Sequence, residues 1–152
     1  VSGATYTSES VIAAAQLALN GGMSYEKGGE IALNSDFSKY KAEVSDNGDG
    51  SYHVTVLGFG MLPENKEIAS YSGHTYSRNE FDITISDGKV TSVVFATFGD
   101  TTGFGDKCMD EAYLESYVDK GLNDSADLIS SSTYTSESVA AAVNAALNAA
   151  NN

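Results

Sequence analysis

The sequence predicts an α+β fold in which helices pack on an antiparallel sheet. The first observation behind this prediction is that strand patterns fill the middle of the chain, whereas the strongest helical pattern comes last. The second is that the strands are separated by turns rich in Asp, Asn, Gly and Ser, which join antiparallel neighbours. Both observations favour helices that follow the sheet along the chain and cover it.

Two hairpins account for the predicted strands. Tyr52, Val54 and Val56 recur at every second position, which is typical of a strand with one buried face. The second hairpin has a β-branched second strand and a short turn around Gly88. The predicted elements are strands at 40–44, 52–59, 81–85 and 90–98, turns at 46–50 and 86–89, and a long polar loop at 62–78.

Helices are predicted at 11–19, at 107–119 and from residue 139 onward. Ser8 and Ser136 are the expected N-caps, because a serine hydroxyl accepts from free N–H groups of the first helical turn. The side chains expected on buried faces are Val139, Val143, Ala146 and Leu147 in the last helix and Met109, Tyr113, Tyr117 and Val118 in the 107–119 helix.

The two ends of the chain repeat one phrase. Residues 2–20 align with residues 130–148 at a constant spacing of 128, and 13 of the 19 positions are identical. This period is that of a whole domain rather than of a solenoid unit. We therefore expect residues 1–20 to be the closing motif and helix of a preceding copy, or a linker helix, and residues 21–152 to form one complete domain of a tandem array.

The charge narrows the choice of partners. The chain has 21 acidic and 8 basic side chains, a net charge of -13. Such a charge repels phosphate backbones, so no nucleic-acid partner is expected. Cys108 is the only cysteine, which excludes an internal disulfide. It is expected to be a buried thiol at a helix start.

The repeated phrase has the composition of an anion site. Ser2–Ser8 reads SGATYTS, with small residues and hydroxyls directly before a predicted helix. Free N–H groups at a helix N-terminus, together with hydroxyl donors, suit a phosphate. An ordinary capped helix is the alternative explanation, since Ser and Thr are good caps.

This phrase resembles the signature of the FMN-binding domain family, found in the covalent-flavin subunits of the sodium-pumping NADH:quinone reductase and the Rnf complex and in multi-domain surface flavoproteins. In that family a threonine of S-G-A-T-x-[ST] holds FMN through a phosphoester bond made by a flavin transferase. The matching residues are Thr5 and Thr133. Asp127 matches the aspartate that the family has six positions before the threonine. Ser131 and Ser132 replace the family's Gly-Ala.

A second motif resembles the family's E-T-P-G-L-G loop, which contacts the flavin ring. It is Asp100–Gly105, and it follows a hairpin similar to the family's D-G-K-I-x-x-V. Thr102 stands where the family has Pro, and Phe104 where it has Leu. The resemblance covers about residues 40–152 and implies an FMN-binding-domain-like fold. The residues it assigns to ring contacts are Thr101, Thr102, Gly103, Phe104 and Gly105.

The resemblance implies an extracellular or cell-surface electron-transfer module rather than an enzyme with its own substrate. Ser130, Thr135 and Ser136 would hold the phosphate, and Asp127 would be read by the transferase or place the threonine. The implied partners are the flavin transferase, a membrane electron donor and neighbouring copies of the domain.

Two other functions stay open at this point. The chain is alternatively a flavin-free structural repeat that serves as a spacer, adhesin or filament subunit, or a reductase that binds FMN non-covalently. Metal chemistry is not indicated, because His53 and His74 lack ligand spacing and the acidic turn 46–50 reads as a hairpin rather than a calcium loop. No nucleophile–base–acid set supports hydrolysis.

Overall fold

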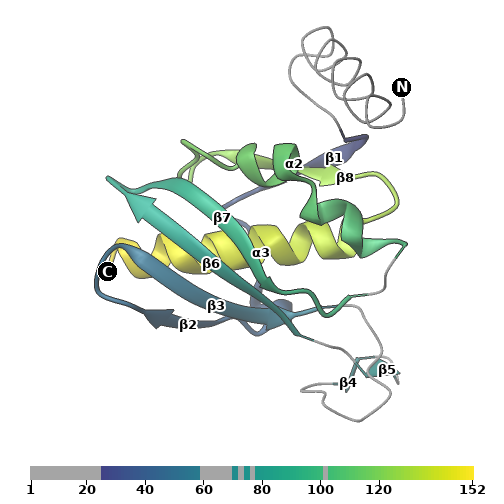
Figure 1. Ribbon diagram of the computed structural model, residues 1–152, viewed down its shortest axis with the longest axis horizontal. Coiled ribbons are helices and arrows are strands. Elements are labelled where there is room, and N and C mark those ends of the chain that lie inside the picture. Colours follow the sequence, from purple (N-terminus) through teal and green to yellow (C-terminus); the bar gives the residue numbers. More distant parts are fainter. Residues whose placement is uncertain (1–24, 59–69, 72–73, 76–77, 101–102) are drawn as a thin grey trace, which may run out of the picture.

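The computed structural model describes residues 25–58, 70–71, 74–75, 78–100 and 103–152, with only the backbone described at 70–71 and 74–75. Their fold is α+β, as predicted (Figure 1). In chain order the elements are β1 (Lys27–Ala32), the 3-10 helix η1 (Ser38–Tyr40), β2 (Glu43–Asp46), β3 (Ser51–Leu57), β4 (Ser70–Tyr71), β5 (His74–Thr75), β6 (Arg78–Ser86), β7 (Lys89–Thr97), the 3-10 helix η2 (Gly105–Met109), α2 (Glu111–Glu115), β8 (Ser125–Ile129) and α3 (Thr133–Ala150).

A four-stranded antiparallel sheet has the order β2-β3-β6-β7. Both predicted hairpins are confirmed. In the first turn, Asp46 Oδ1 accepts from the Gly48 N–H at 2.7 Å and Asp49 Oδ1 accepts from the Ser51 N–H at 2.9 Å. In the second turn, Asp87 and Gly88 have φ of 51° and 73°, the positive values that a tight two-residue hairpin requires.

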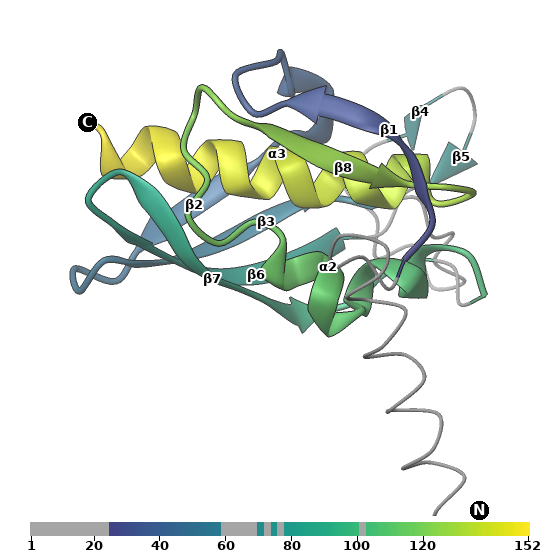
Figure 2. The same ribbon diagram turned by 90° about the horizontal axis from the view of Figure 1, so that it is seen from above.

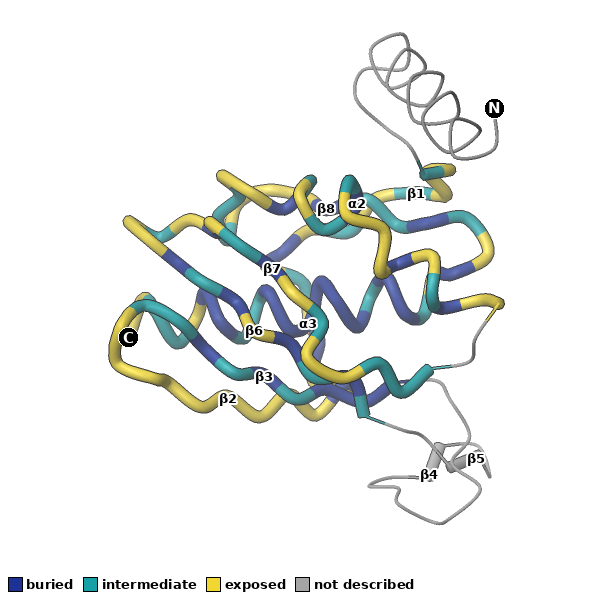
Figure 3. The backbone as a smooth tube through the Cα atoms, in the orientation of Figure 1, coloured by how far each residue is buried: buried dark blue, intermediate teal, exposed yellow. Residues whose placement is uncertain are grey.

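Helix α3 lies between this sheet and the smaller pair β1–β8 (Figure 2). It contacts β3 and β6 on one side and β8 on the other. Its predicted apolar face is confirmed, because Val139, Val143, Ala146 and Leu147 are fully buried. Small residues fill most of the remaining positions, so both layers approach the helix closely, and Figure 3 shows it buried along most of its length.

Three helical predictions are corrected. The single helix expected at 107–119 is η2 followed by the short α2, since the Asp110 carboxylate caps a new start by accepting from Ala112 N–H at 2.9 Å. Tyr113 and Tyr117 are buried as expected, but Met109 and Val118 are 44% and 39% exposed. α3 begins at Thr133, so Ser136 lies inside its first turn rather than at its N-cap. Ser8 lies outside the described residues.

The pair β1–β8 was not predicted. Its strands are almost a whole domain apart in sequence and pair antiparallel, with Glu30 opposite Asp127. His53 belongs to β3 of the four-stranded sheet, and its Nδ1 lies 2.8 Å from Asp82 Oδ1, a contact that raises the pKa of the imidazole. In the described part of the chain, no cluster of metal-ligating side chains occurs, and no helix has the length and hydropathy to cross a membrane.

Candidate functional site

Two loops meet at the N-terminus of α3. One, residues 130–132, connects β8 to α3, and the other, residues 98–104, connects β7 to η2. Thr135 Oγ1 donates to Asp100 Oδ2 at 2.5 Å, and Ser132 Oγ donates to the carbonyl oxygen of Phe104. The structure thus brings together the two motifs that the sequence singled out.

A cavity of about 290 Å³ lies between these loops. Thr133, the first residue of α3, is exposed at this cavity. Phe104 is 63% exposed, so an aromatic face is available at the rim. The residues that line the cavity are Phe104, Gly105, Ser131, Ser132, Thr133, Tyr134 and Thr135.

The glycines of the second motif, Gly103 in the loop and Gly105 at the start of η2, are required for different physical reasons. Gly105 is fully packed: a Cβ there would lie 2.6 Å from Thr135 Oγ1 and 2.9 Å from the Asp100 Cβ. A Cβ on Gly103 would meet nothing, but its φ of +91° is a conformation that other residues rarely adopt. Gly105 therefore permits the contact between the loops, and Gly103 permits the turn.

Ser131 has a φ of 65°, in the left-handed region. This is the position at which the resembling family has glycine, which adopts that conformation without steric cost. Ser132, where the family has alanine, is buried, and its hydroxyl is bonded to Phe104. The two departures from the family motif therefore have opposite consequences: one strains the loop, and the other ties it to its neighbour.

We predict that Ser131→Gly stabilises the protein by about 0.5–1 kcal/mol, because relief of the left-handed strain exceeds the added unfolded-state entropy. Urea unfolding checks this result. Ser131→Ala is the matched control and should give no gain, because alanine also has a Cβ. A glycine variant no more stable than the alanine variant would show that the loop is not strained.

Ser136 and Cys108 lie behind the cavity wall. Ser136 Oγ accepts from the Ile129 N–H at 2.9 Å and donates to the Ser132 carbonyl at 2.8 Å, so the hydroxyl holds the loop from inside. Cys108 Sγ lies 3.5 Å from the same hydroxyl. Burial raises the pKa of the Cys108 thiol to about 12, and the thiol stays neutral, as expected for a buried cysteine.

The start of the second loop, residues 98–104, depends on Asn79, which is completely buried at the beginning of β6. Its Oδ1 accepts from the Gly99 N–H at 2.9 Å, and its Nδ2 donates to Ser138 Oγ at 3.0 Å. One side chain thereby fixes both the loop and α3. The sequence contained no signal for this role, because an asparagine at a strand start also reads as a turn residue.

On the other side of the loop, β1 supports Ser130. The Ser130 N–H donates to the Glu26 carbonyl at 2.8 Å, and a Cβ on Gly28 would lie 2.8 Å from the Ser130 Cα. Only glycine allows this approach. The adjacent Gly28-Gly29 pair is the signal in the sequence that indicates such a close approach.

Asp127 lies on β8 and is held by two residues of the N-terminal strand region. Its Oδ2 accepts from the Tyr25 hydroxyl at 2.7 Å, and its Oδ1 lies 3.0 Å from Lys27 Nζ. Desolvation opposes the charge, but the hydrogen bonds from Tyr25 and Lys27 prevail and lower the pKa of Asp127 below its ordinary value of 3.8. The Asp127 carboxylate therefore links the start of β1 to β8, next to the loop of residues 130–132.

We predict that Asp127→Asn lowers the free energy of unfolding at neutral pH, and that its difference from wild type narrows in acid. The folded-state pKa of Asp127 is depressed, so its contribution is complete well above pH 3.8 and is lost as the pH falls below that value. Urea unfolding at pH 7 and near pH 3 checks this. A difference independent of pH would show that the charge has no role.

A cluster of charged and aromatic side chains backs Tyr134, which lines the cavity. The Tyr40 and Tyr134 rings pack edge to face with centroids 5.4 Å apart, and Lys39 Nζ lies 5.7 Å from the Tyr134 ring centroid. Glu137 accepts from the Tyr40 hydroxyl at 2.5 Å and from Lys39 at 2.8 Å. This wall was not predicted, because its members come from η1 and α3, which are far apart in sequence.

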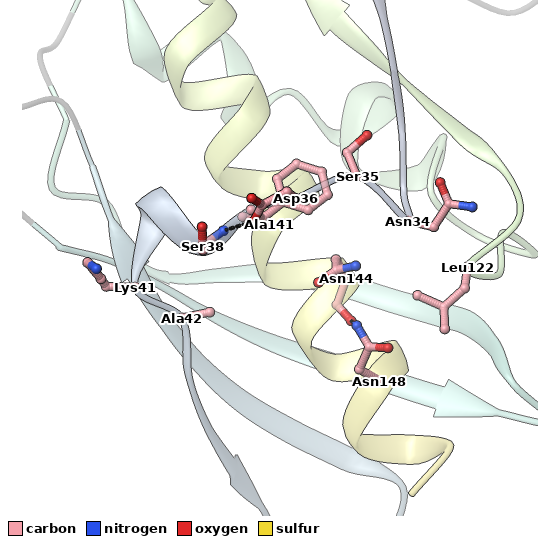
Figure 4. A pocket seen from close by; sticks show the side chains of 11 residues that line it. Asn34, Ser35, Asp36, Ser38, Lys41, Ala42, Leu122, Ala141, Asn144 and Asn148 are labelled. Carbon is pink, nitrogen blue, oxygen red and sulfur yellow. Dashed lines mark hydrogen bonds between the residues drawn. The ribbon is translucent and has the colours of Figure 1, made fainter.

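A different pocket, of about 480 Å³, lies along the C-terminal half of α3 (Figure 4). At about 1.5 Å per residue, Asn148 is roughly 20 Å along the helix from Thr135. The Asn144 and Asn148 amide groups that face it already donate to carbonyls of the protein, at 2.6 Å to Leu33 and at 2.9 Å to Asn144. This pocket is separate from the convergent loops.

The predicted site residues fall into three groups. The first group lies in the convergent loops, at the start of η2 or in the first turn of α3, and it consists of Ser130, Gly103, Phe104, Gly105, Thr133 and Thr135. Ser136 and Asp127 support the loop that contains Ser130 from behind and from below. Thr101 and Thr102, inside the second loop, lie outside the described residues, as does Thr5 near the chain start. For all of these residues, contacts with a ligand are predictions.

Comparison with protein families agrees with this geometry. Residues 76–148 match the family model of the FMN-binding domain. This range includes β6, β7, η2, α2, β8, most of α3 and both convergent loops. The match supports assignment of residues 76–148, just under half of the chain, to the FMN-binding domain family, and it indicates a flavin-binding module in this part of the chain. The comparisons with curated proteins and with solved structures found no match.

The residues present suit FMN. A phosphate needs N–H donors and an accessible hydroxyl, and the N-terminus of α3 offers both at Thr133. A flavin ring needs an apolar or aromatic surface, and Phe104 and Tyr134 supply two aromatic side chains at one cavity.

Proposed function

We propose that this chain is an electron-transfer module that holds FMN covalently, through a phosphoester bond to Thr133. The main observation in support is the exposed Thr133 at a cavity between the two motif loops. FMN supplies the redox chemistry when it is bound, and the protein supplies attachment, orientation and electrostatics. The proposed role is a redox carrier rather than an enzyme with its own substrate.

The proposed attachment is a substitution at phosphorus. Thr133 Oγ forms the new P–O bond, the bond from phosphorus to the leaving group of an activated flavin nucleotide breaks, and a transferase base takes the hydroxyl proton. The N-terminus of α3 would hold the phosphodiester, whose single negative charge suits the positive helix end. Thr135 is engaged with Asp100 and Ser136 with Ser132, so we assign both a positioning role.

The proposed ring contacts come from the second loop. Phe104 is the aromatic residue at the cavity rim, and Tyr134 stands on the α3 side with Tyr40 and Lys39 behind it. The fixed Asp100–Thr135 and Phe104–Ser132 bonds hold the two sides at a constant separation. A ring bound between them would keep its orientation without a closing movement.

The wider setting is part of the same proposal. We place the module outside the cytoplasmic membrane, where a covalent bond keeps the cofactor from diffusing away. Its electrons come from a membrane donor and pass to an external acceptor or to a neighbouring copy of the domain. Thr5, in the repeated phrase, is the proposed attachment site of the preceding copy.

Retention of flavin after denaturation tests the attachment. The chain co-expressed with a flavin transferase should stay yellow and fluorescent after unfolding in guanidinium and gel filtration, because a phosphodiester survives both. A chain that loses its colour on unfolding would favour a non-covalent FMN protein. A colourless native chain would favour a flavin-free structural repeat, which the 13 identities in 19 positions between the two ends of the chain also suit.

A further inference from the structure

Most of the large apolar side chains that are exposed in the described residues lie at one place. Five large hydrophobic residues are exposed, and three of them, Val94, Met109 and Val118, line a single groove of about 370 Å³. Residues of α2 and β7 line most of this groove. β7 is an edge strand of the four-stranded sheet, and α2 lies beside it (Figures 1 and 2). Grouped exposed apolar residues mark interaction surfaces more often than scattered ones do.

This α2–β7 groove has an acidic rim. Its lining residues are Thr91, Ser92, Val93, Val94, Met109, Glu111, Leu114, Glu115 and Val118. Glu111 and Glu115 are exposed, and within the described part of the chain neither carboxylate takes part in an ion pair. No lysine or arginine lines the groove. A complementary partner therefore has an apolar centre surrounded by basic side chains.

The groove is close to the cavity of about 290 Å³ in which we propose that the flavin binds, called the flavin cavity below. η2 begins at Gly105, which lines the cavity, and ends at Met109, which lines the groove. Five residues of 3-10 helix span about 8 Å from first to last, at about 2 Å per residue. A protein seated on the groove would approach the flavin from the side of Phe104, the exposed aromatic residue of the cavity rim.

We propose that the α2–β7 groove is the docking surface for a basic redox protein that exchanges electrons with the flavin. This inference rests on the carrier function proposed above and adds its partner class and its contact surface. The apolar centre supplies short-range contact, and Glu111 and Glu115 steer the encounter, so the rate of electron transfer falls as salt screens them.

Electron transfer to cytochrome c, a small basic haem protein, tests the proposal by stopped flow. Each fully reduced flavin reduces two ferric haems to ferrous haems and releases its protons to water. We expect Glu111→Gln/Glu115→Gln to lower the second-order rate constant about tenfold at low salt and to weaken its salt dependence. Val94→Thr/Met109→Gln, which removes apolar contact without a charge change, should lower it severalfold.

The matched control is Glu43→Lys, which makes the same change in net charge on β2, at the opposite edge of the sheet. It should change the rate less than twofold. A small neutral quinone, which needs no docking surface and is not steered by charge, should react with all loaded variants at similar rates. A Glu43 variant as slow as the Glu111/Glu115 variant, or groove variants as fast as wild type, would overturn the docking surface and leave the carrier function. A chain that takes up no flavin would contradict both.

Discussion

Replacement of Gly105 by alanine should separate the two loops of the proposed flavin site. The new Cβ would lie 2.6 Å from Thr135 Oγ1 and 2.9 Å from the Asp100 Cβ, closer than real contacts allow. Thr135 is buried in the first turn of α3 and bonded to Asp100, so its hydroxyl has little room to withdraw. We expect the variant to lose about 2–3 kcal/mol of unfolding free energy, as in overpacked cores, together with most of its flavin loading.

A double-mutant cycle with Thr135→Ala isolates the cause. Removal of Oγ1 takes away the closest clash, so Gly105→Ala should cost less in the Thr135→Ala background than in wild type. Gly103→Ala is the positional control, because its Cβ meets nothing and only its φ of +91° opposes the change. It should cost about 1 kcal/mol and retain the Asp100–Thr135 bond. Equal costs at the two glycines would contradict close packing at Gly105.

Asn79→Ala is the second change with a large expected effect. Asn79 is completely buried, and its amide satisfies both the Gly99 N–H and the Ser138 hydroxyl. Its truncation leaves a cavity and two groups without these bonds, and we expect a loss of about 3 kcal/mol in urea unfolding. Gly99 lies near the start of the second loop, residues 98–104. Because this loop forms one side of the proposed flavin site, flavin loading should fall as well.

Ser138→Ala provides the comparison for Asn79. It removes only one of the two bonds and should cost about 1 kcal/mol. In the Ser138→Ala background, Asn79→Ala should cost less, because one of its partners is already gone. Strictly additive costs would mean that Asn79 does not link the two elements. Full flavin loading in a folded Asn79→Ala chain would mean that the loop does not depend on it.

The parts of the fold that the sequence predicts correctly are local. The β2–β3 and β6–β7 hairpins depend on turn chemistry at 46–50 and 86–89, where Asp and Gly determine the backbone over a few residues. The buried face of α3 follows from apolar spacing within one helix. The two site motifs are likewise contiguous in sequence, so they could be recognised before their convergence was known.

The missed features depend on contacts between distant segments. β1 is a polar, glycine-containing strand whose pairing with β8 is fixed by Tyr25 and Lys27 on Asp127, which no local pattern indicates. Ser136 fits an N-cap by local preference, but its bond to Ile129 N–H places it inside α3. The α2–β7 groove arises because Asp110 ends η2 and starts a new helix, which leaves Met109 and Val118 exposed.

The intact mass of the chain, co-expressed with a flavin transferase, tests the central claim most directly. The account predicts an increase of one FMN less water at Thr133, or of two such units if Thr5 is modified as well. One unit should be absent from Thr133→Ala, while Thr5→Ala keeps the unit at Thr133. An unmodified mass, under conditions in which a control domain with an S-G-A-T motif is labelled, would contradict covalent flavin attachment in this protein.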